Sequence, residues 1–127
     1  MKNLKNYAMA LVALVIAATS VTLMSFAKSN QTMVTLYFQG DTQDPNEIED
    51  ASNWVEQATP PSCSGEDKAC SITVDPADAI ELGGSRQLDP SRITLEATPG
   101  AGSHYVPQKN TNASSSPNPI TVQNQDL

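Results

Sequence analysis

The sequence has little of what most enzymes and nucleic-acid binders use. Its 127 residues include seven lysines and arginines, one histidine, two cysteines and six aromatic side chains. Fourteen acidic residues give a formal charge of −7, which opposes binding to DNA, RNA and anionic lipid. Two cysteines exclude a heavily disulfide-stapled toxin, and so short a chain excludes a large α/β enzyme and a polytopic membrane protein.

The beginning of the chain has the pattern of a removable export signal. Lys2 and Lys5 form a short positive segment, and an uninterrupted apolar run covers residues 8–18. Small residues at Ser25 and Ala27 then stand where a signal peptidase inspects the chain. This pattern predicts a protein that is exported, and that is periplasmic, on the cell surface or secreted.

Two fates are open for residues 1–27. The first is a signal peptide that is cleaved between Ala27 and Lys28, which the polar residues in its second half favour. The second is retention of residues 8–27 as a membrane anchor, because a helix of that length crosses about 30 Å of hydrocarbon. We expect contact with a membrane only in the second case.

The chain that follows the signal is poor in the residues that build a core. Residues 28–127 contain 16 Leu, Ile, Val and Phe side chains and carry a formal charge of −9. Such a composition lies at the edge of intrinsic disorder. We therefore predict a mostly irregular chain with a small β-rich (α+β) ordered part. It would comprise an N-terminal apolar signal helix, a short β-meander with one disulfide loop, and a disordered C-terminal tail.

The two cysteines, Cys63 and Cys70, are expected to form a disulfide. An even count in an exported chain favours pairing, because the compartment is oxidising. The closed loop of eight residues would stabilise the fold by about 2.5 kcal/mol. A metal site or a redox-active pair is the weaker alternative, because the spacing fits neither and His104 lies 34 positions further on.

Short stretches of alternating apolar residues predict the strands. Residues 33–39 alternate most clearly, and β-branched and aromatic side chains favour a strand there. Three further strands are expected after the second cysteine, and a hairpin turn at residues 83–85 joins the last two. The inward-facing side chains are expected to be Val34, Leu36, Phe38, Ile72, Val74, Ile80, Leu82, Ile93 and Leu95.

One short helix is expected between the first two strands. Asp44 provides a cap, Pro45 stands at the first position and Glu47 follows in the first turn. The helical face would contain Ile48, Ala51, Val55 and Ala58. Trp54 beside this face is expected to pack in the core, and an exposed binding platform is the alternative.

The character of the chain changes near its end. Residues 108–127 are rich in Ser, Asn, Pro and Gln, with scattered apolar side chains. Such a segment buries too little to offset the entropy lost on ordering. The expected organisation is a signal peptide (1–27), a small β-rich domain with the Cys63–Cys70 loop (28–107) and a disordered tail (108–127).

No catalytic residue, cofactor site or metal site is predicted. His104 has no acid or cysteine close in sequence, and so small a chain has little room for a rigid triad. An acidic cluster is the alternative binding site, for calcium, although it lacks the EF-hand spacing. Its members are Asp41, Asp44, Glu47, Glu49 and Asp50.

The segments around the tryptophan and the cysteines resemble a group of exported proteins. Asn53-Trp54 is followed by PPSC, GEDKAC and SITV. This order is similar to that of small Bacteroidota-type exported proteins of unknown function. The resemblance covers residues 1–75 and implies a Gram-negative export context without an assigned activity.

Together these features favour a non-enzymatic accessory protein outside the cytoplasm. Its partner would be another protein or a surface polymer. The alternatives are a calcium-binding module and a membrane-tethered protein with its N-terminal helix retained.

Overall fold

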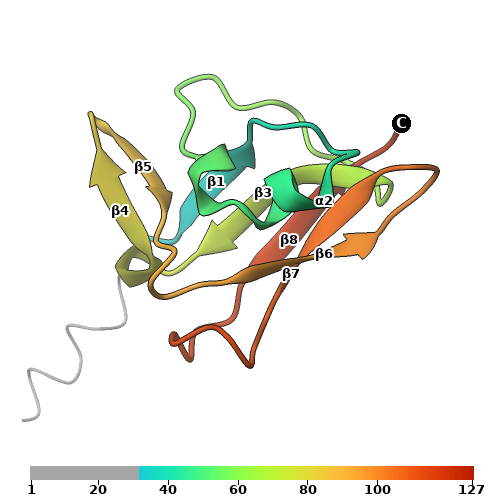
Figure 1. Cartoon of the computed structure of the whole chain (residues 1–127). Helices are drawn as coiled ribbons and strands as arrows, with labels where there is room; N and C mark the ends of the chain where they lie inside the picture. Colours follow the sequence, from blue (N-terminus) through green and yellow to red (C-terminus); the bar gives the residue numbers. More distant parts are fainter. Residues whose placement is uncertain (1–31) are drawn as a thin grey trace, which may run out of the picture. The chain divides into compact units, whose positions relative to one another are not determined.

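This computed structural model describes residues 32–127, which contain eight β-strands and three short helical elements joined by loops (Figure 1). The predicted signal helix and the cleavage position Ala27–Lys28 lie outside these residues. Within 32–127, no helix has the length and apolar character needed to cross a membrane. In chain order the elements are β1 (Val34–Phe38), α2 (Pro45–Glu49), η1 (Ala51–Asn53), β2 (Trp54–Val55), β3 (Lys68–Val74), η2 (Pro76–Asp78), β4 (Ala79–Leu82), β5 (Ser85–Leu88), β6 (Leu95–Pro99), β7 (Tyr105–Lys109) and β8 (Thr121–Gln125).

The strands form one large sheet and one hairpin. The sheet is antiparallel and has the order β4-β5-β2-β1-β3-β8, and β6 pairs with β7 alone. The predicted β-rich fold is confirmed. A simple meander is not, because β3 pairs with β1 and with β8, which comes almost fifty residues later.

The turn predicted at residues 83–85 exists but joins different strands. Gly83 and Gly84 both have positive φ (63° and 93°) and link β4 to β5. A two-residue hairpin turn needs this conformation, which glycine adopts without strain. Strand β5 was not expected, because its sequence SRQL shows no apolar alternation. The inward position predicted for Leu82 is also wrong, since its side chain is 53% exposed.

The prediction of a disordered tail over residues 108–127, with the domain ending at 107, is wrong. Strand β8 pairs with β3 along most of its length, for example Val122 with Ile72. The segment before β8 is held by polar contacts: Ser114 N donates to Asn110 O and Ser116 N donates to Arg92 O, both at 2.9 Å. Hydrogen bonds therefore order this segment, which contains too few apolar side chains to be ordered by their burial alone.

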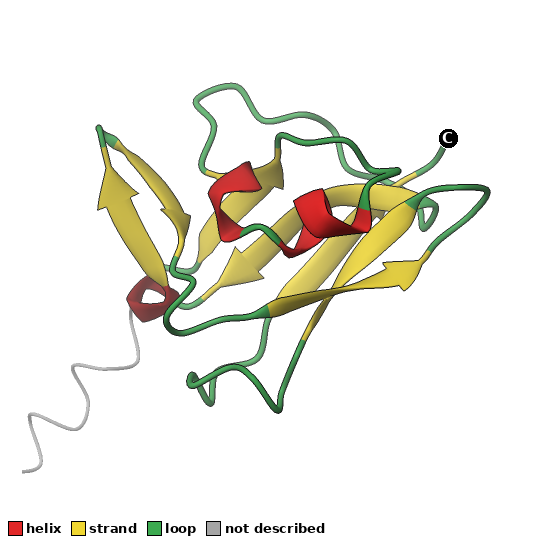
Figure 2. Ribbon diagram, in the orientation of Figure 1, coloured by secondary structure: helices red, strands yellow, loops and turns green. Residues whose placement is uncertain are grey.

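The core lies between the large sheet and the elements that cross it. The hairpin β6–β7 passes over the side of the sheet that contains β3 and β8, and α2 packs against this hairpin (Figure 2). Leu36, Ile72 and Val74 from the sheet are buried against Ile93 and Leu95. Burial of these side chains, predicted from alternation, is confirmed.

Trp54 packs in the core, as predicted. Its side chain is fully buried, its ring centroid lies 5.0 Å from that of Phe38, and Nε1 donates a hydrogen bond to Ile48 O at 2.9 Å. The alternative of an exposed aromatic platform is excluded. A buried indole with its N–H satisfied anchors the sheet to the helical segment.

The helix begins as predicted but ends earlier. Asp44 accepts a hydrogen bond from Asn46 N (2.9 Å), which caps α2. Asp50 then accepts from Ser52 N (2.8 Å) and starts the separate turn η1. This second cap interrupts the helix, so Val55 lies in β2 and the predicted helical face stops at Ala51.

Candidate functional site

The candidate site combines the disulfide loop with the edge strand β8. Cys63 and Cys70 form the predicted disulfide, with a Cα–Cα distance of 5.7 Å. Disulfides are typical of oxidising environments, so this bond indicates a location outside the cytoplasm. Cys70 is buried within β3, and the loop that precedes it turns back towards the end of β8.

Four hydrogen bonds attach the disulfide loop to the end of β8 and the two residues after it. Asp67 N donates to Gln125 O (3.2 Å), and Asp126 N donates to Ser64 O (3.1 Å). Glu66 N donates to Asp126 Oδ1 (3.3 Å), and Leu127 N donates to Asp67 Oδ2 (3.1 Å). The loop that the disulfide closes therefore fixes one end of the edge strand.

Gly65 makes this close approach possible. Its φ is +131°, a conformation that L side chains rarely adopt. A Cβ atom there would collide with the side chain and backbone of Asp126. The loop can therefore meet the end of β8 only with glycine at this position.

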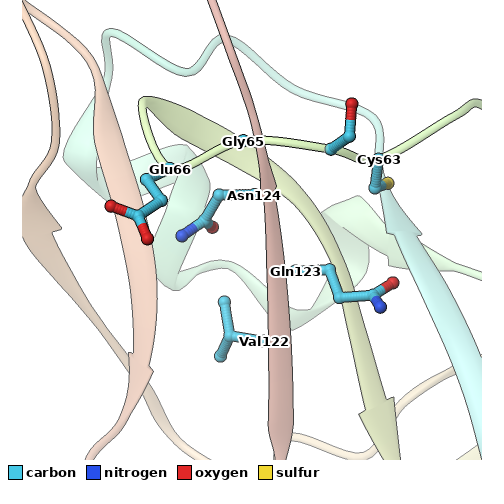
Figure 3. Close-up of a pocket in the computed structure, with 7 residues that line it drawn as sticks. Cys63, Gly65, Glu66, Val122, Gln123 and Asn124 are labelled. Carbon is cyan, nitrogen blue, oxygen red and sulfur yellow. The ribbon is translucent and has the colours of Figure 1, made fainter.

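A hollow of about 350 Å³ lies where the loop meets the strand, lined by Cys63–Glu66 on one side and Val122–Asn124 on the other. Val122 and Asn124 project to one side of β8 and Gln123 to the other (Figure 3). The hollow is open to solvent rather than enclosed, and polar atoms make up much of its lining. Its form suits a side chain of a larger partner better than a small-molecule substrate.

Asn124 is the one side chain in residues 32–127 with a buried polar atom that lacks a hydrogen-bond partner, its Oδ1. Asn124 is also one of the residues that line the hollow. A buried acceptor without a donor destabilises a fold by about 1–3 kcal/mol. Asn124 Oδ1 is therefore an acceptor for which residues 32–127 provide no donor.

The outer side of β8 is a free sheet edge. Among the described strands, only β3 pairs with β8. Gln125 O accepts from Asp67 N on the β3 side, and successive residues of a strand direct their backbone groups to opposite sides. The N–H and C=O groups of Val122 and Asn124 are thus directed outwards, where they can pair with another backbone.

The surroundings of this edge are acidic. Residues 32–127 contain all fourteen acids but only four bases, a formal charge of −10. Glu66, Asp67 and Asp126 surround the end of β8, and Lys68 stands opposite Gln125. The other three bases are engaged elsewhere: Arg86 with Glu56 (3.7 Å), Arg92 with Asp78 (2.7 Å), and Lys109 with backbone carbonyls.

A second polar cluster surrounds the buried Asp78. Its carboxylate accepts hydrogen bonds from Arg92 Nε (2.7 Å), Ser116 Oγ (2.8 Å) and Asn118 Nδ2 (3.0 Å). Burial raises the pKa of Asp78, but these hydrogen bonds and the positive charge of Arg92 outweigh it and hold the pKa below its ordinary value. Because both carboxylate oxygens of Asp78 accept hydrogen bonds from within the chain, this cluster joins η2 to the segment before β8.

The acidic residues considered for calcium are separated into individual turns. Asp44 and Asp50 cap backbone N–H groups, and Glu47 Oε2 accepts from Asp41 N at 2.6 Å. Glu49 Oε1 accepts from Ala97 N on β6 (3.1 Å). Hydrogen bonds from Ser52 lower the pKa of Asp50. In residues 32–127 no three His, Cys, Asp or Glu side chains gather as metal ligands.

His104 also has a local partner. Its Nδ1 lies 2.6 Å from Thr42 Oγ1, and Tyr105 N donates to Thr42 O (2.7 Å). These contacts join the start of β7 to the loop before α2. The structure gives this histidine a role in holding that loop.

Sequence reasoning identified the disulfide but missed the edge strand and Asn124. The alternation of Ile120 and Val122 with polar residues was a signal for a strand, obscured by the polar composition around it. Asn124 gave no signal of its own.

Neither a protein-family model, a curated protein nor a solved structure matches this chain.

Proposed function

We propose that this chain is an exported, non-enzymatic binding protein that acts in the periplasm, at the cell surface or after secretion. The disulfide and the export pattern of residues 1–27 support the location. The resemblance to small Bacteroidota-type exported proteins supports a Gram-negative host. The partner is another protein, which contacts the outer edge of β8 and the hollow beside it.

One observation carries the choice of a protein partner: β8 is a free strand edge that the disulfide loop holds in place. A strand edge presents N–H and C=O groups at the spacing of another polypeptide backbone. A surface polysaccharide would not match that spacing. Tethering of the loop also keeps the edge ordered before binding, which reduces the entropy lost on association.

Site-specific photocrosslinking in intact cells tests this function. The full chain, with its leader, would carry a photoreactive amino acid at Gln123 on β8, or at Glu81 on the opposite edge strand β4 as the matched control. We expect a defined crosslinked protein from position 123 and none from position 81. Equal crosslinking from both positions, or none from either, would contradict the proposal.

The mass of the protein recovered from the same cells tests its location. A cleaved and oxidised chain lacks residues 1–27 and two hydrogen atoms. A chain that keeps residues 1–27 would instead be tethered to the membrane, and this outcome would exclude secretion. In either case, a disulfide between Cys63 and Cys70 would show that the chain was exported, because the cytoplasm keeps cysteines reduced.

A further inference from the structure

We infer that the outer edge of β8 takes up an extended, positively charged segment of another protein as an additional strand of the sheet. This inference rests on the proposed function and names the chemistry of its partner. The added strand would pair with the outward N–H and C=O groups of Val122 and Asn124. The sheet would then continue as β3, β8 and the partner strand.

The edge of β8 lacks the devices that usually prevent such pairing. Natural edge strands are protected by lysine, proline, a bulge or a very short length. Thr121–Gln125 has neither a charged residue nor a proline, and the irregularity in its pairing lies on β3, between Ala69 and Ser71. The opposite edge, β4, is one residue shorter and carries Glu81.

The hollow determines which side chain of the partner fits beside the strand. A strand laid along β8 brings a side chain to the hollow between Glu66 and Asn124 (Figure 3). Asn124 borders the same space, and its Oδ1 has no hydrogen-bond donor among residues 32–127. Lysine and arginine offer several N–H donors and a positive charge for the Glu66 carboxylate.

Charge decides between a different protein and a second copy of this chain. Each copy of residues 32–127 carries a formal charge of −10, with Glu66, Asp67 and Asp126 close to the edge. Pairing two β8 strands would bring these carboxylates together, and like charges across an interface are unfavourable. A cationic strand instead meets a complementary field and associates faster.

The test uses the oxidised chain as it is recovered from the exporting host, and synthetic peptides as probes. One peptide alternates lysine with valine, the second has glutamate in place of lysine, and the third has a proline at the centre of the lysine peptide. We expect only the first to bind, and salt to weaken its binding. Hydrogen exchange should show new protection at the amides of Val122 and Asn124.

Charge substitutions on β8 locate the binding. Gln125 is exposed, and we expect the affinities of Gln125→Lys and Gln125→Glu for the lysine peptide to differ by about fivefold, the glutamate variant being tighter. Gln57, beside the β4–β5 turn, provides the same pair of substitutions as a control. The Gln57 pair should differ by less than twofold, because the charge there is largely screened at that distance.

Four results would overturn the inference. Equal binding of lysine and glutamate peptides would remove the charge argument, and protection away from β8 would place the peptide elsewhere. Protection of Val122 and Asn124 without peptide, together with concentration-dependent dimerisation, would make the occupant a second copy. If no peptide binds but position 123 still crosslinks a protein in cells, strand addition is wrong and the proposed function stands.

Discussion

Removal of the Asp78 carboxylate is the sharpest test of how the segment before β8 is held. Its three hydrogen bonds come from Arg92, Ser116 and Asn118, and the Asp78 and Ser116 side chains are buried. Hydrogen bonds to a charged group contribute about 1.5–3 kcal/mol each, and donors that reach water recover part of that. We expect Asp78→Ala to lower the free energy of unfolding by about 3 kcal/mol.

Urea denaturation followed by circular dichroism measures this loss, and Asp75→Ala is the matched control. Asp75 is also a carboxylate in the same turn, but it accepts one hydrogen bond, from Ala77 N at 2.8 Å. Loss of such a cap costs about 1 kcal/mol. Hydrogen exchange should also become faster over residues 110–120 in Asp78→Ala but not in Asp75→Ala.

The pH dependence has a definite sign. Because the pKa of Asp78 is lower in the folded protein than its ordinary value of 3.8, its carboxylate stabilises the fold above that pH. The difference between the wild type and Asp78→Asn should therefore be constant from pH 7 to pH 5. It should shrink as the pH falls below 3.8. A loss no larger than that of Asp75→Ala, or one independent of pH down to pH 2, would refute this account.

Three further predictions concern the disulfide, the tryptophan and the glycine. Replacing Cys63 and Cys70 together by serine should lower the free energy of unfolding by about 2.5 kcal/mol and speed amide exchange in β8. Unchanged exchange in β8 would contradict the conclusion that the disulfide loop fixes the end of this strand. Trp54→Phe should cost about 2 kcal/mol in urea denaturation, because Ile48 O loses its donor; a cost below about 0.5 kcal/mol would contradict this. Gly65→Ala should lower the melting temperature more than Gly83→Ala, since Gly83 has nothing within 4 Å of the added methyl and Gly65 has Asp126; equal shifts would contradict the steric explanation.

The parts of the fold that follow from local patterns were predictable. Alternation located β1, β3 and the buried Ile93 and Leu95, and Asp44-Pro45 marked the start of α2. The even cysteine count gave the disulfide. Each of these features depends on residues that are neighbours in sequence, so the chain itself contains the information.

The parts that depend on distant polar contacts were not predictable. In the sequence, Asp78 has no feature that sets it apart from the other acids. Its hydrogen-bond donors Ser116 and Asn118 lie about forty residues further along the chain. A composition rule counts apolar side chains and so assigned residues 108–127 to disorder. The candidate site was lost for the same reason, because its edge strand lies in that segment.

The attachment of the disulfide loop to the end of β8 has a consequence for the order of folding. Cys63 and Cys70 are seven positions apart, so their loop closes rapidly, whereas Asp126 must find Ser64 from about sixty positions away. An oxidised loop is therefore ready before its distant counterpart arrives, and it acts as a preformed template. Pairing of the final strand is then the slower step, and the molecule can meet a partner only after that strand is in place.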